Sequence, residues 1–85
     1  MLLVFNKERL VFDARDLLDE FETSIINLPI SIEIKYFDGV APCGLALLIE
    51  ESDLEAIENI LNGNEIMIKY VFTGGRHDKE YKKLR

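Results

Sequence analysis

The sequence predicts a small α+β domain in which strands and helices follow the order β-α-β-β-α-β. Two unbroken apolar runs, 1–5 and 45–49, are typical of strands that are covered on both faces. Two other segments, 9–22 and 52–62, repeat apolar residues every three or four positions, as amphipathic helices do. With right-handed connections this order closes as a ferredoxin-like sandwich, in which a four-stranded antiparallel sheet has both helices on one face.

The middle of the chain is predicted to be a connection followed by a strand. Asn27 and Pro29 interrupt regular structure, so residues 23–29 are expected to form the connection. Residues 30–36 then alternate between apolar and polar, which is typical of a strand with one solvated face. Asp38 and Gly39 signal the turn that follows this strand.

The last third of the chain supplies the second helix and the fourth strand. Ser52 is expected to begin the helix through a capping box with Glu55, and residues 65–72 are expected to be the closing strand. In the predicted spatial order 4-1-3-2, the two apolar strands lie in the middle and one sheet face stays uncovered. An open apolar face favours a homodimer or a surface that docks a partner.

The chain length and composition indicate one compact domain at residues 1–72, followed by a basic, flexible tail at 73–85. A chain of 85 residues with 48% hydrophobic and 31% charged residues is typical of a folded protein. A chain this short buries only about 60% of its unfolded surface, so a partner subunit would add stability. The last residues carry five lysines and arginines against two acidic residues, which suits contact with an acidic surface.

The charge of the body argues against nucleic acid as a partner. Residues 1–72 carry fourteen acidic residues against five basic ones, and such a surface repels phosphate backbones. The apolar start of the chain is too short for a secretory core or a membrane span, so neither export nor a membrane is expected. A single cysteine suits a reducing compartment, and we expect the protein to be cytoplasmic.

Cys43 is the one candidate nucleophile, and two interpretations of it stay open. It lies where a loop enters a central strand, and Gly44 beside it has no side chain to block a small group near the sulfur. The only histidine, His77, lies in the tail, so a protease-like pair of cysteine and base is not indicated. Counted back along the strand, however, Cys43 faces the helices, where an unpaired cysteine usually packs as a small hydrophobe.

The chain resembles the selenium/sulfur (Se/S) carrier protein-like family of small domains. The residues that carry the resemblance are Leu2-Leu-Val-Phe5, Ala14-Arg-Asp-Leu17-Leu18, Leu28-Pro-Ile30, Cys43-Gly-Leu-Ala-Leu47 and Asp53-Leu54. The resemblance spans residues 2 to about 72, and its specific part is Cys-Gly-Leu-Ala-Leu. It implies that Cys43 holds a transferable sulfur or selenium atom, that Gly44 is its neighbour in the site, and that donor and acceptor proteins are the partners.

Three other interpretations use different residues. A non-catalytic interaction module would act through the open sheet face. A divalent-cation site would use the acidic residues near the two helices, although no Asp-x-Asp-x-Asp-Gly loop for calcium is present and solvated helix faces account for them. Gly74-Gly75 resembles the end of carriers that bear a C-terminal thiocarboxylate, but ten residues follow it. No cofactor and no metal ligand set is predicted.

Overall fold

A computed structural model describes residues 1–74 and 80–85 of the chain. It is an α+β fold with three α-helices and a five-stranded antiparallel sheet in the order β2-β3-β1-β4-β5. The strands are β1 (Leu2–Val4), β2 (Thr23–Asn27), β3 (Leu45–Ile49), β4 (Tyr70–Thr73) and β5 (Lys82–Lys83). The helices are α1 (Glu8–Leu17), α2 (Ile30–Phe37) and α3 (Leu54–Gly63), the last preceded by a 3₁₀ turn, η1 (Glu51–Asp53).

Strand β1 lies in the centre of the sheet, as its unbroken apolar sequence predicts. It pairs with β3 through Leu2 opposite Leu48, and with β4 through Leu3 opposite Val71. Every residue of β1 is fully buried, because side chains that alternate between the two faces meet a cover on each of them. This central strand therefore contributes side chains to both cores, one on each face of the sheet.

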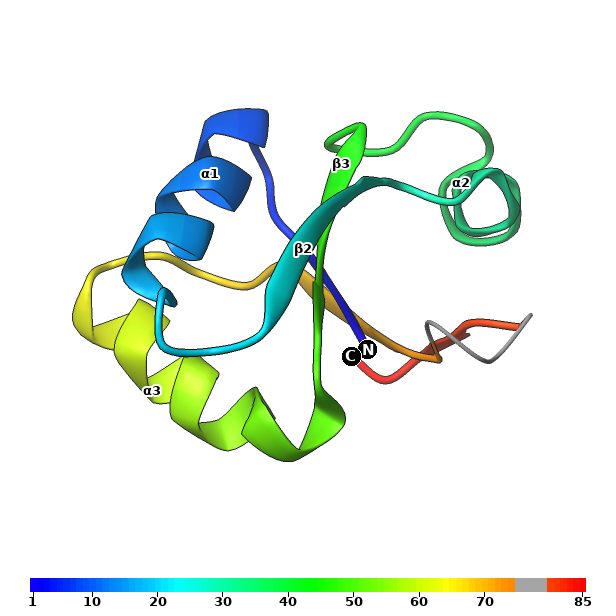
Figure 1. Cartoon of the computed structure of the whole chain (residues 1–85). Coiled ribbons are helices and arrows are strands. Elements are labelled where there is room, and N and C mark those ends of the chain that lie inside the picture. The colour runs from blue at the N-terminus through cyan, green and yellow to red at the C-terminus, as the bar shows by residue number, and fades with distance from the viewer. Residues whose placement is uncertain (75–79) are drawn as a thin grey trace.

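Helices cover both faces of the sheet. Figure 1 shows α1 and α3 on one side of the strands and α2 on the other. The residues of α1 and α3 belong to one core cluster with Leu3, Leu47 and Val71, whereas Ile32 of α2 belongs to a second cluster with Leu2 and Phe72. Each cluster takes alternate residues of the same strands, so the sheet divides two cores. Within the described residues, no helix is long and apolar enough to cross a membrane.

The predicted strand at 30–36 is wrong, because these residues form helix α2. The Pro29 carbonyl accepts hydrogen bonds from the amides of Ile32 (3.0 Å) and Glu33 (3.2 Å), which begin the helix. The helix ends at Asp38 and Gly39, both in the left-handed region at φ 50° and 85°, and the Gly39 amide returns to the Glu33 carbonyl at 2.8 Å. The turn expected at Asp38-Gly39 is confirmed as this helix end.

The second strand comes from the segment that we expected to be a connection. Residues 23–27 pair with β3 along their whole length, from Thr23 opposite Ile49 to Asn27 opposite Leu45. The predicted sheet of four strands with two helices is therefore wrong in its count, since α2 and β5 are additional. The predicted open sheet face is also wrong, because Ile32, Tyr36 and Phe37 of α2 pack against it.

The start of α3 differs from the predicted capping box. The helix begins at Leu54 after the 3₁₀ turn, and neither this turn nor the helix has a side-chain cap hydrogen bond at its start. Ser52 lies inside the turn, in which the Asp53 amide donates a hydrogen bond to the Glu50 carbonyl at 3.0 Å. Local hydrogen bonding within the turn replaces the reciprocal pair that the sequence spacing suggests.

The end of the chain is held against the sheet rather than extending away from it. Strand β5 pairs with β4, and the amide of Leu84 donates to the carbonyl of Val71 at 2.7 Å. Arg85 makes an ion pair with Glu58 of α3. Gly74 has φ 102°, and a Cβ there would lie 2.7 Å from the Glu80 carbonyl oxygen, so glycine allows the chain to return. Gly75 and His77 lie outside the described residues.

Tyr36 joins α2 to this C-terminal segment. Its hydroxyl donates to the Tyr81 carbonyl (3.3 Å) and accepts from the Lys83 amide (3.4 Å), and its ring packs edge-on against Phe72 at 5.0 Å between centroids. The cover of this sheet face therefore has two parts, α2 and residues 80–85, that depend on one another.

A pair of isoleucine substitutions on α2 tests the helix against the predicted strand. Ile32 is 1% exposed and Ile34 is 65% exposed, so Ile32→Ala should lower the free energy of unfolding by about 2–5 kcal/mol and Ile34→Ala by less than about 0.5 kcal/mol. Urea unfolding measures both values. In a strand the two side chains would share one face, and equal losses for the two variants would contradict the helix.

Removing the Tyr36 hydroxyl should loosen the C-terminal segment. We expect Tyr36→Phe to cost about 0.5–1.5 kcal/mol of unfolding free energy and to speed amide hydrogen exchange at Lys83 and Leu84. Tyr70→Phe is the matched control, because the Tyr70 hydroxyl has no hydrogen bond within the described residues. Equal exchange at Lys83 in the two variants would show that the Tyr36 hydroxyl does not hold this segment.

Candidate functional site

Cys43 lies in an irregular segment between α2 and β3. The segment runs from Asp38 to Gly44, and the strand begins at Leu45. The Gly44 carbonyl accepts a hydrogen bond from the Leu28 amide at 2.9 Å, which continues the ladder between β2 and β3 by one step. The backbone next to the cysteine is thus fixed to the sheet on one side, although the residues before it have no regular structure.

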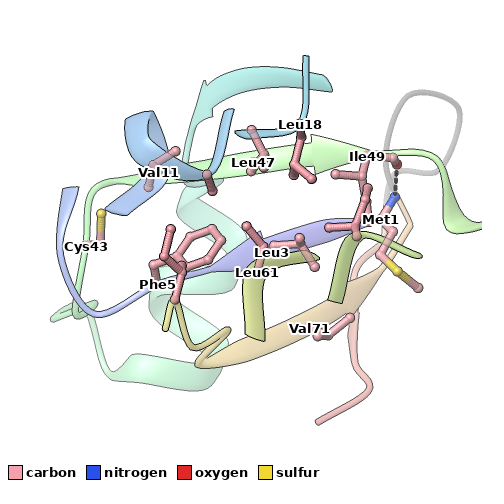
Figure 2. Close-up of a cluster of buried hydrophobic side chains, with 13 residues drawn as sticks. Met1, Leu3, Phe5, Val11, Leu18, Cys43, Leu47, Ile49, Leu61 and Val71 are labelled. Atoms are coloured by element: carbon pink, nitrogen blue, oxygen red, sulfur yellow. Dashed lines mark hydrogen bonds between the residues drawn. The ribbon is translucent and has the colours of Figure 1, made fainter. Parts of the chain in front are cut away.

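The side chain of Cys43 is 6% exposed and belongs to the core cluster on the side of α1 and α3. The prediction that it faces these helices is confirmed. Figure 2 shows Cys43 at one end of the cluster, beyond Phe5 and Val11, while Met1 and Ile49 mark the other end. The sulfur is therefore at the rim of the core, and most of its surface is covered by apolar neighbours.

Within residues 1–74 and 80–85, one polar contact reaches the sulfur. The backbone amide of Leu45 donates a hydrogen bond to Cys43 Sγ, with 3.4 Å between the nitrogen and the sulfur. This donor belongs to the first residue of β3, which lies opposite Asn27 of β2. A backbone amide directed at a sulfur atom stabilises negative charge on it.

Gly44 is exposed, and the space beside it is open. No atom of the described structure lies within 4 Å of the position that a Cβ of Gly44 would occupy, apart from its chain neighbours. Side chains alternate between the two faces along β3, so this opening is on the sheet face opposite the Cys43 side chain.

The acidic residues of the two helices remain separate surface groups. Asp13 pairs with Arg9 at 3.8 Å and Asp16 with Arg15 at 3.4 Å, all on the exposed side of α1. Among the described residues, no group of three or more His, Cys, Asp and Glu side chains is placed to hold a metal ion.

The structure also contains a hollow that the sequence analysis did not predict. A hollow of about 180 Å³ lies between α2 and the C-terminal segment, lined by Ser31, Ile32, Lys35, Tyr36, Glu80 and Tyr81. No pattern in the sequence points to this hollow, because the segment that supplies four of these residues was expected to be a strand and the other two residues were expected to be part of a tail. The structure does not bring Cys43 into this hollow.

Comparisons with known proteins add no relative to these observations. The chain matches no protein-family model, and neither the curated proteins nor the solved structures include a match to it.

Proposed function

We propose that the chain carries a sulfur or selenium atom on Cys43 between a donor and an acceptor protein in a reducing compartment such as the cytoplasm. The observation that supports this proposal is the hydrogen bond from the Leu45 amide to Cys43 Sγ. The sulfur carries a negative charge before it attacks and again after it leaves, and a nearby donor stabilises that charge in both states. We also propose that the core of the fold is ferredoxin-like. This core consists of β1, α1, β2, β3, α3 and β4, and α2 and β5 are additions to it.

Loading is an exchange between a thiol and a persulfide. The Cys43 thiolate attacks the outer sulfur of a donor persulfide, a new S–S bond forms, and the donor cysteine leaves as a thiolate when its own S–S bond breaks. An acceptor thiolate then attacks the same outer sulfur, and Cys43 leaves as a thiolate. The number of electrons on the sulfur atoms is conserved in each step, so neither step needs an external oxidant or reductant.

The burial of Cys43 sets a condition on this exchange. Attack requires a line of approach to the sulfur, and only a small fraction of the side chain is exposed. Cys43 itself belongs to the irregular segment 38–44, which forms neither a helix nor a strand. We infer that donors reach the sulfur through a local movement of this segment, without unfolding of the domain.

A second candidate function, a non-catalytic interaction module, is favoured by the outer surface of α2. Ile30 and Ile34 are 70% and 65% exposed, one helical turn apart, and Val40 after the helix is 81% exposed. Apolar side chains of this size in a row are typical of a surface that meets another protein. This surface replaces the sheet face that the sequence analysis considered for docking.

Alkylation of the native protein tests whether Cys43 is reached locally. We expect the rate at neutral pH to be the same, within about twofold, in wild type and in Ile49→Ala, because the buried Ile49 lies at the opposite end of the cluster from Cys43 and stays packed during a local opening of segment 38–44. If the sulfur is reached only by global unfolding, the rate rises with the unfolding equilibrium, by roughly 30-fold for each 2 kcal/mol lost. That rise would remove the basis for a carrier.

Persulfide formation tests the proposed activity. After incubation with a cysteine desulfurase and cysteine, intact-mass measurement should show the gain of one sulfur atom, reversed by a thiol reductant. Cys43→Ser should show no gain, because no other cysteine is present. Wild-type protein that alkylates in the native state but gains no sulfur would contradict the proposal.

A further inference from the structure

The two edges of the sheet are of different kinds. At one edge lies β5, whose two residues are both exposed lysines. Lysines on an edge strand discourage pairing with another chain, because their charges would be brought together or buried. At the other edge lies β2, with the sequence Thr-Ser-Ile-Ile-Asn, five residues without a charge or a proline. The features that usually protect an edge are absent from β2.

The backbone of β2 has hydrogen-bonding groups that face outward. Leu28 donates to Gly44, so in this antiparallel ladder residues 24, 26 and 28 face β3. Thr23, Ile25 and Asn27 therefore direct their amides and carbonyls away from the sheet, and within the described part of the chain these groups meet no other strand. Figure 1 looks onto this edge: β2 lies in front of β3, between α1 and α2, and neither helix crosses it.

Both cores also end at β2. Ile25 lies at the margin of the core under α1 and α3, and Ile26 lies at the margin of the core under α2, each only half-buried. A strand added beside β2 would extend the sheet and cover both isoleucines further, one on each face. The edge therefore offers backbone pairing together with apolar contact on two sides.

The sequence of β2 is complementary to itself in antiparallel pairing. With Ile25 opposite Ile25 of a second copy, Thr23 lies opposite Asn27, and each of these outward-facing pairs exchanges two hydrogen bonds. No charged residue of the strand meets a like charge in this register. A two-fold axis through Ile25 gives a closed interface, as in most homodimers.

We propose that β2 pairs with β2 of a second copy of this chain, which joins the two sheets into one continuous sheet. In this arrangement the Cys43 loops lie at opposite ends of the shared edge, because each loop adjoins the Leu28 end of its own strand. The dimer does not depend on the carrier function.

Proline at position 27 tests the pairing. Asn27→Pro removes an outward amide without removing a bond to β3, and Asn27→Ala is the matched control that keeps the amide and loses the same side chain. In sedimentation velocity over a range of concentrations, wild type and Asn27→Ala should dimerise alike, and Asn27→Pro should dimerise at least about tenfold more weakly. A monomeric wild type, or a proline variant that dimerises like the alanine variant, overturns the proposal.

Hydrogen exchange of the wild-type protein provides a test that needs no variant. The amides of Thr23, Ile25 and Asn27 should exchange more slowly as the protein concentration rises through the dimerisation range, whereas those of Ser24 and Ile26, already bonded to β3, should change less. If a dimer forms while the outward amides keep their exchange rates, the copies meet elsewhere and the proposal is wrong, even where Asn27→Pro fails to fold.

Discussion

The fold depends on the burial of β1 on both faces. Leu2 and Val4 direct their side chains to one core, and Leu3 and Phe5 to the other, with no exposed surface on any of them. Such a strand is stable only between two paired neighbours and beneath two layers of cover. The neighbours are β3 and β4, and one layer is α1 with α3. The other layer requires α2 and the C-terminal segment, so these additions to the predicted fold are needed to close it.

The central part of the fold was predictable because its signals are local and strong. An apolar run without polar residues has no stable place at the edge of a sheet, and this consideration alone puts β1 and β3 in the interior. The periodicity of α1 and α3 shows their buried sides in the same way. These elements can be predicted from their own residues, without reference to the rest of the chain.

The error at 30–36 comes from two patterns that coincide in a short segment. Ile32 and Tyr36 are four residues apart and face the sheet, while Ile30 and Ile34 are also four apart and face outward. Two apolar rows on opposite sides of a helix produce the alternation of apolar and polar residues that is typical of a strand. Pro29, which we took only as a break, is compatible with the start of a helix because it lacks the amide that a first turn leaves unbonded.

For the candidate site, the sequence could predict the position of Cys43 and the side of the sheet that it faces, but not how far it is covered. Parity along β3 determines its direction, whereas its exposure depends on the conformation of the irregular segment 38–44 that contains it. That arrangement follows from α2, which was not predicted. The Leu45 amide contact could not be anticipated either, since it depends on the conformation of two residues at the entrance of the strand.

The composition of α2 has a consequence for the handling of this protein. Isoleucine, tyrosine and phenylalanine make up five of its eight residues and favour extended structure, so the helix persists through the packing of its inner row. When heat or a destabilising substitution releases that row, the segment gains the features of a cross-β zipper: it is short, rich in β-branched residues and nearly uncharged overall. Partial unfolding on this side of the sheet is therefore the route by which we expect the protein to form insoluble fibrils.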